Sequence, residues 1–210
     1  DLGGQCSQQT AEHDLCAAEL GRVGVHDQVE RRSRLRHGGD RSGDRGLAST
    51  AMGKVYDGLG ERLVEWIDRQ HMFFVATAAS AADGTVNLSP KGTDGTLVVL
   101  DQNRLAYLDL TGSGIETVAH VRENGRITLM WCAFEGPPRI VRVHGTGRVV
   151  TPGDMDWEQM VGLFELRPGQ RAVVEITARR ISDSCGYAVP RLDFVAERTR
   201  LDEWAAARSD

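Results

Sequence analysis

Short apolar segments joined by turn residues make up most of the chain after residue 52, and this pattern constrains the fold more than any other feature. Residues 139–150, for example, alternate between apolar and polar side chains, as a strand with one buried face does. The segments with strand-like patterning are 71–78, 85–89, 96–100, 104–110, 126–134, 139–150 and 171–181. Most of them are separated by too few residues for the crossover that parallel strands need. The pattern therefore predicts a mainly β fold with added helices, built as a small antiparallel barrel.

Helices are expected at four places between and after these strands. They are predicted at 57–70, 113–124, 154–164 and 201–208. In the first, apolar residues recur at i, i+4, i+7 and i+8, which places them on one face. Gly125 suits the left-handed position that ends the second. Asp154 is a candidate N-cap for the third.

The first 51 residues differ in composition from the rest of the chain. All twelve aromatic residues lie at or after Tyr56. A segment so poor in large apolar groups cannot offset the entropy of ordering it. We therefore expect residues 1–51 to be a disordered extension upstream of a natural start at Met52, followed by one domain over 52–210. A basic RNA-contacting arm is the disfavoured alternative, because eight acidic residues outnumber seven arginines there.

Charge and motif content exclude several classes of protein. A net charge of −5 and a pI of about 5.7 argue against a general binder of nucleic acid or anionic membranes. The sequence has no CxxC pair, no metal-ligand spacing among its histidines and no GxSxG motif, so neither a metal site nor a serine hydrolase is expected. We also expect no secretory leader, and no apolar run approaches 18 residues. By default these features predict a soluble cytoplasmic protein.

The segment after the first hairpin turn could form one wall of a binding site. Asn87, Ser89 and Lys91 alternate along a predicted strand, so their side chains share one face. An amide, a hydroxyl and a cation together suit an anionic or polar ligand. The alternative is an exposed edge strand with a solvated lysine.

A glycine- and hydroxyl-rich loop leads from the strand at 104–110 into the helix at 113–124. Thr111, Gly112 and Ser113 would place free backbone N–H groups at a helix N-terminus, where a phosphate can bind. The alternative is local: Ser113 as an N-cap that forms a capping box with Glu116. The two interpretations are compatible.

The last predicted strand ends in a cluster of small polar residues around one aromatic residue. Ser184 could donate a hydrogen bond to a planar ligand, and Tyr187 could stack on it. No basic neighbour points to an activated thiol at Cys185, so we expect a buried structural thiol there rather than a nucleophile. Arg139, near the turn at 135–138, could pair with a phosphate or simply be solvated.

Several blocks of the sequence resemble the pyridoxamine 5′-phosphate oxidase-like family of FMN-binding split barrels. They are HMFFVATA, DGTVNLSPKG, LDLTGSGIET, CAFEGPPRI and SDSCGYAVP, within residues 52–210. The resemblance implies a split β-barrel and a homodimer with FMN at the subunit interface. It implies that Thr111, Gly112 and Ser113 hold the flavin phosphate and that the strand with Asn87, Ser89 and Lys91 lines the flavin. The segment with Ser184, Cys185 and Tyr187 would approach the ring from the other subunit.

Two departures from the family pattern bear on activity. True pyridoxamine phosphate oxidases carry Ser-Arg-Lys at the phosphate loop, whereas Ser113 is followed here by Gly114 and Ile115. Their C-terminal Arg-His pair has no clear equivalent near Arg191. The resemblance thus implies an FMN-dependent oxidoreductase of unknown substrate, and the two departures argue against true pyridoxamine 5′-phosphate oxidation. The alternative is a non-catalytic flavin, deazaflavin or haem protein that stores or senses its ligand.

Overall fold

The structure is a computed structural model that describes residues 53–112 and 115–208. These residues belong to one compact unit, Ser42–Asp210. The predicted extension at 1–51 and the predicted phosphate-loop residue Ser113 lie outside the described residues.

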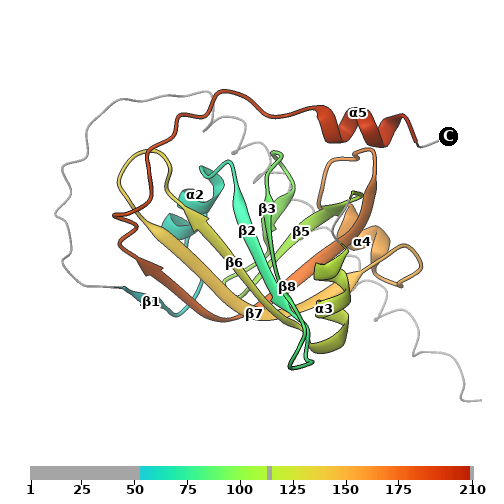
Figure 1. Ribbon diagram of the computed structural model, residues 1–210, viewed down its shortest axis with the longest axis horizontal. Coiled ribbons are helices and arrows are strands. Elements are labelled where there is room, and N and C mark those ends of the chain that lie inside the picture. The colour runs from blue at the N-terminus through green and yellow to red at the C-terminus, as the bar shows by residue number, and fades with distance from the viewer. Residues whose placement is uncertain (1–52, 113–114, 209–210) are drawn as a thin grey trace, which may run out of the picture. The chain divides into compact units, whose positions relative to one another are not determined.

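One mixed-length antiparallel sheet forms the body of the protein (Figure 1). Its strands are β1 (Val55–Tyr56), β2 (Phe73–Ala78), β3 (Val86–Lys91), β4 (Leu97–Val99), β5 (Arg104–Leu110), β6 (Arg126–Cys132), β7 (Ile140–Val150) and β8 (Gln170–Ser184). The order is β3-β2-β6-β7-β8-β5-β4, with β1 paired to β8. The edge strands β3 and β4 are joined by only residues 92–96, so the sheet must curl toward closure. The predicted mainly β fold, an antiparallel split barrel with a few helices, is confirmed.

The core lies on the inner face of this curled sheet. Its largest fully buried side chains include Trp131, Tyr107, Leu105 and Leu129. The helix α2 (Glu61–Asp68) adds its buried residues Leu63, Trp66 and Ile67 to the same cluster. The apolar face predicted for this helix is therefore the face that packs on the barrel.

The helix α3 (Glu116–Asn124) connects β5 to β6 and packs on β2 and β7. It ends as predicted, with Gly125 at φ +69° donating its N–H to the Val121 carbonyl. It begins later than predicted, with Ile115 in the N-cap position and no side-chain cap. The predicted capping box of Ser113 with Glu116 stays a prediction, because Ser113 lies outside the described residues.

The helix α4 (Trp157–Val161) is shorter than the predicted 154–164. The expected N-cap is wrong: Asp154 instead accepts hydrogen bonds from the N–H and hydroxyl of Thr151, at 2.7 and 2.9 Å. Asp154 closes a turn with Thr151, and this turn delays the helix.

Two segments of the chain join the barrel from its ends. The two-residue strand β1, which the sequence pattern did not reveal, pairs Val55 with Ser182 and Tyr56 with Ile181. At the other end, the short helix α5 (Arg200–Ala206) follows a long extended segment. None of the helices that the structure describes is long and apolar enough to cross a membrane.

Candidate functional site

The edge strand β3 turns its polar face inward. Val86 and Leu88 are 74% and 61% exposed, whereas Asn87, Ser89 and Lys91 are half-buried. The predicted alternation is confirmed. The alternative of a solvated polar edge is wrong, since the apolar residues of β3 face outward instead.

A buried hydrogen-bond network joins the middle of β3 to α3. The Asn87 amide donates to the hydroxyl of Thr117 at 2.8 Å and to that of Thr77 at 3.3 Å. The Thr77 hydroxyl also bonds His120 Nδ1 at 3.1 Å, and Ser89 donates to the Asn87 carbonyl at 3.0 Å. His120 is therefore a buried histidine held by a hydrogen bond within the fold. The side chain of Asn87 thus joins the edge hairpin to α3, and Ser89 holds the Asn87 side chain in place.

Lys91, Asp109 and Arg171 form an ion-pair cluster, here called the pocket cluster. The Asp109 side chain is 1% exposed and accepts hydrogen bonds from Lys91 Nζ at 3.3 Å and from Arg171 Nε and Nη2 at 2.9 and 2.7 Å. The Lys91 ammonium lies 5.9 Å from the ring centre of Tyr107. Burial, with a contribution from Asp109, raises the pKa of the Tyr107 hydroxyl, which has no hydrogen-bond partner among the described residues. Two cations share one carboxylate at this end of the barrel.

A cavity of about 510 Å³ lies beside the pocket cluster, and Lys91 is part of its wall. Its lining is Pro90, Lys91, Gly92, Thr93, Thr96, Leu108, Leu110, Thr111, Gly112, Leu201 and Trp204. The Thr111 N–H donates to the Gly169 carbonyl at 2.6 Å, which holds the start of the loop against the base of β8. Three of the predicted cofactor residues, Lys91, Thr111 and Gly112, therefore meet in one cavity of the size that small ligands occupy.

The residues of α5 in this cavity, Leu201 and Trp204, were not predicted as site residues. They lie about 90 residues from Thr111 in the sequence. The only local signal in the sequence that could have indicated a site here is a tryptophan within a short predicted helix. In the structure the side chain of Trp204 stays 39% exposed.

A second group of predicted site residues lies at the other end of β8. Arg139 bonds Asp183 through Nε and Nη2 at 3.2 and 3.1 Å, and its Nη2 also donates to the Tyr56 hydroxyl at 2.6 Å. Tyr56 in turn donates to the Asp183 carboxylate. We call Tyr56, Arg139 and Asp183 the β1 cluster, because it ties β1 to the end of β8. Arg139 is therefore neither free for a phosphate nor simply solvated in this chain.

The hydrogen bonds to Asp183 also lower the pKa of its carboxyl group. Burial acts to raise the pKa of its carboxyl, but hydrogen bonds from Tyr56, the Lys54 N–H and Arg139 outweigh it and leave this pKa below its ordinary value. Burial and the bond to Asp183 raise the pKa of Tyr56. The carboxylate thus stays charged and the phenol stays protonated across the neutral range.

The remaining predicted residues follow the β1 cluster along the chain. Ser184 accepts a hydrogen bond from Arg142 at 3.0 Å, and Tyr187 is exposed. Cys185 is also exposed, so the prediction of a buried thiol is wrong. The reason is that the sheet ends at Ser184, after which Gly186, at φ +65°, packs its Cα against the Arg139 backbone and turns the chain away.

The two groups of predicted residues do not meet within one chain. The base of β8 pairs Gln170 with Leu110 next to the cavity, whereas its far end pairs Ser184 with Ile140. Fifteen residues of strand span roughly 45 Å of chain. The predicted residues that are remote from the cavity are therefore Arg139, Ser184, Cys185 and Tyr187.

Solved structures of similar fold come from several bacteria. HupZ of Group A Streptococcus is 25% identical, with a TM-score of 0.43 over 58% of this chain and 90% of that one. A protein titled a pyridoxamine 5′-phosphate oxidase from Lactobacillus delbrueckii is 19% identical, with a TM-score of 0.47 over 62% and 98%. HutZ of Vibrio cholerae, titled a haem storage protein, is 14% identical, with a TM-score of 0.41 over 60% and 93%.

Sequence comparison is more decisive. A curated relative, the pyridoxamine 5′-phosphate oxidase family protein ustO of Aspergillus flavus, is 39% identical over 145 residues, or 68% of this chain. The chain spans 58% of the length of that relative. The sequence model of the family described as pyridoxamine 5′-phosphate oxidase matches residues 59–185, from before α2 to the end of β8. The chain therefore belongs to the pyridoxamine 5′-phosphate oxidase family.

Proposed function

We propose that this protein is an FMN-dependent oxidoreductase whose flavin binds at the cavity beside the pocket cluster. One observation carries the proposal: Lys91, three threonines, Gly112 and an apolar wall with Trp204 line the same space of about 510 Å³. A cation and hydroxyls suit a phosphate, and an apolar wall with an indole suits a flat ring. FMN combines these two parts.

The lining also discriminates between possible cofactors. Among the described residues that line the cavity there is no histidine, cysteine, methionine or tyrosine. Haem iron takes its axial ligands from those residue types, so the donor set fits a flavin better than haem. A deazaflavin with a phosphate would make the same contacts, and it remains the second ligand to test.

The protein's own residues would bind and orient the ligand. When bound, a flavin supplies redox chemistry that no side chain provides. Lys91 would contact the phosphate as an ammonium, held in place by Asp109, while Thr111 and the Gly112 backbone would fix the phosphate against the start of the loop. No reaction with pyridoxamine 5′-phosphate is proposed, because the family's Ser-Arg-Lys triplet is missing here.

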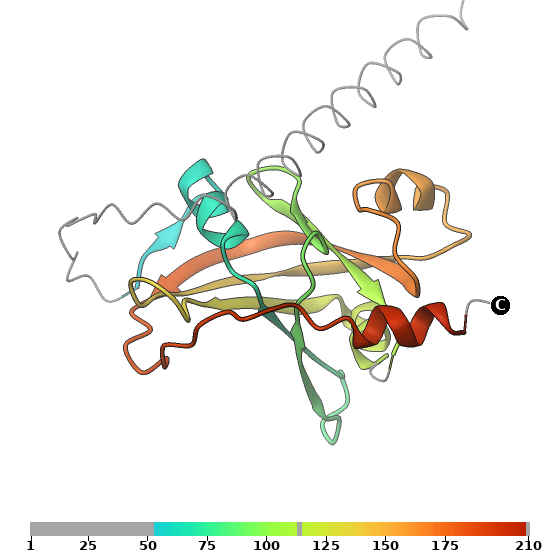
Figure 2. The same cartoon turned by 90° about the horizontal axis from the view of Figure 1, so that it is seen from above.

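We further propose that the protein acts as a homodimer. The edge strand β3 exposes Val86 and Leu88 in a hairpin that projects from the barrel (Figure 2). Exposed apolar residues on an edge strand are a common signature of a protein interface. A second subunit would also bring its own Ser184 and Tyr187 toward a site that one chain leaves incomplete.

The described cysteines, Cys132 and Cys185, form no disulfide, which suits a cytoplasmic protein.

The absorption spectrum of the purified protein and a titration with FMN test the proposed cofactor. Lys91→Met should weaken FMN binding by about 10- to 100-fold, because a charge-assisted contact contributes about 1.5–3 kcal/mol. The same substitution should change the affinity for riboflavin little, because riboflavin lacks the phosphate. Lys54→Met at the β1 cluster is the matched control and should leave both affinities unchanged. Absence of FMN binding to the wild-type protein at micromolar concentrations would refute the proposal.

A role in storage or sensing is the second candidate function. It is favoured by one observation: Lys91 is the only titratable residue in the described cavity lining, and it is paired with Asp109. The cavity thus offers no separate general acid or base for turnover. Mixing the flavin-loaded protein with NAD(P)H distinguishes the two functions. The bound flavin of an oxidoreductase should be reduced, whereas that of a storage protein should stay oxidised.

A further inference from the structure

The chain after β8 crosses the molecule and returns to the cavity. Residues 186–208, here called the C-terminal strap, leave the β1-cluster end of β8, run past the end of the barrel and finish in α5 on the cavity side (Figures 1 and 2). The family match ends at residue 185. The strap therefore lies outside the segment that the family model matches.

Specific contacts hold the middle of the strap against the barrel. The Leu192 N–H donates to the Phe134 carbonyl at 3.0 Å, and the Phe194 N–H donates to Glu135 Oε1 at 2.9 Å. The Phe194 ring stacks on His71 with 3.6 Å between ring centres and 7° between planes. These contacts lie along the path of the strap and set where α5 can reach.

The end of the strap is seated by a close backbone approach. Gly169, at φ +74°, lies beneath α5: a Cβ there would come within 2.8 Å of the Ala205 Cβ and 2.5 Å of Thr111 Cγ2. Ala205 is the buried residue of α5, and Asp202 pairs with Arg167 at 3.4 Å. The absence of a side chain at residue 169 thus lets α5 pack directly over Thr111, one of the cavity residues.

We propose that the strap supplies the aromatic wall of the ligand site and that Trp204 is its ring-selecting residue. Leu201 and Trp204 line the cavity together with Lys91 and Thr111. The Arg208 guanidinium lies 4.2 Å from the indole centre, which adds a positive charge beside the ring. An indole with a guanidinium beside it, in a cavity that Lys91 also lines, favours a flat aromatic ligand that carries an anionic group. This inference rests on the proposed function and assigns the flavin ring to Trp204, whereas Lys91 takes the phosphate.

Two substitutions of Trp204 distinguish the contribution of an aromatic ring to FMN binding from that of side-chain size alone. Trp204→Leu keeps an apolar residue without the ring and should weaken FMN binding about 10-fold, whereas Trp204→Phe should stay within about 3-fold of wild type. Trp204→Leu should weaken riboflavin binding by the same factor, because stacking acts on the ring and not on the phosphate. Trp157→Leu on α4, away from the described cavity lining, is the control and should change neither affinity.

Tryptophan fluorescence supplies a readout that does not depend on turnover. FMN should quench wild-type emission strongly, and Trp204→Phe should lose more of this quenching than Trp157→Phe. Melting curves show that each variant is folded. If Trp204→Leu binds FMN like wild type, or if the Leu and Phe variants lose affinity equally, the role of Trp204 is refuted while the proposed cofactor stands. If the wild type binds neither FMN nor riboflavin, the proposed function fails and this inference fails with it.

Discussion

Asp109 and Asp183 are both paired with arginine on the sheet, yet their surroundings differ. Asp109 is 1% exposed and is contacted by two cations, Lys91 and Arg171. Asp183 is 19% exposed and accepts its hydrogen bonds from Arg139, a phenol and a backbone N–H. One carboxylate balances two charged side chains, and the other is shared by one charged and two neutral donors.

This difference separates a binding element from a structural one. In the β1 cluster every group that meets Asp183 is used to fasten β1 to β8. In the pocket cluster Lys91 contacts Asp109 and also lines the cavity. A buried carboxylate that holds a cation at a cavity wall can orient it toward a ligand, which a closed hydrogen-bond cluster cannot do.

The largest effect on stability is expected from Asp109→Ala. Removing the carboxylate leaves two cations without their buried partner, which costs about 3–5 kcal/mol in comparable buried pairs. Urea unfolding measures the free energy. Asp109→Asn keeps the size and some hydrogen bonding and should cost less than the Ala variant. A loss below about 1 kcal/mol for Asp109→Ala would show that the pocket cluster is solvated and would remove the contrast with the β1 cluster.

A smaller and pH-dependent effect is expected from Asp183→Asn. Losing the charged hydrogen bonds at this half-buried site should cost about 1–2 kcal/mol at neutral pH. Because the folded-state pKa of Asp183 is lowered, its stabilisation is present above the unfolded-state value of about 3.9 and is lost as the pH falls through the folded-state value. The stabilities of wild type and variant should therefore begin to converge below about pH 4, as measured by unfolding at several pH values. A constant difference down to pH 2 would contradict this account.

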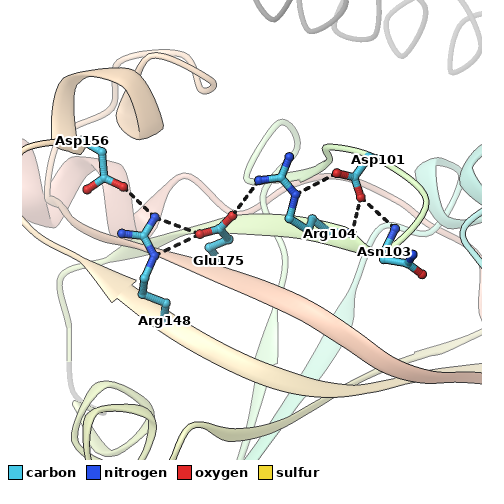
Figure 3. A network of polar contacts seen from close by, with 6 residues as sticks. All are labelled: Asp101, Asn103, Arg104, Arg148, Asp156 and Glu175. Atoms are coloured by element: carbon cyan, nitrogen blue, oxygen red, sulfur yellow. Dashed lines mark hydrogen bonds and ion pairs between the residues drawn. The ribbon is translucent and has the colours of Figure 1, made fainter.

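The smallest effect on stability is expected at a network whose two arginines are half exposed and which serves as a reference for both clusters. Glu175 bonds Arg148 at 2.8 Å and Arg104 at 3.4 Å, and these arginines reach Asp156 and Asp101 (Figure 3). The side chains of both arginines are 52% exposed, although that of Glu175 is only 13% exposed, so solvent screens the cations and Glu175→Gln should cost about 1 kcal/mol or less at low salt. The loss should shrink further in 1 M salt, where exposed charges are screened. A salt-independent loss as large as that of Asp109→Ala would show that burial does not distinguish these ion pairs.

Local pattern was sufficient for much of the fold and for part of the candidate site. The apolar spacing in 57–70 predicted the face of α2 that holds Leu63 and Ile67, and Gly125 marked the end of α3. Alternation in β3 placed Asn87, Ser89 and Lys91 together on one face. These features depend on residues close in sequence, where helix and strand periodicity act directly.

The predictions that failed depended on how the chain ends its local elements. Asp154 was read as a helix cap, but its carboxylate closes a turn with Thr151 instead. Cys185 was expected to be buried, but β8 ends at Ser184, the residue before it, and the chain then turns away from the sheet. Competition between equally local hydrogen bonds, and the exact last residue of a strand, are not encoded in apolar spacing.

The sequence by itself determined the class of fold, its strand segments and the set of polar residues that could bind a ligand. Only the tertiary structure decided that the polar face of β3 points inward, that Arg171 meets Asp109 across 62 positions, and that α5 returns to the cavity. The physical reason is that periodicity defines two faces of a strand but not which face is enclosed. That choice follows from strand order and curl, which bring together residues that are far apart along the chain.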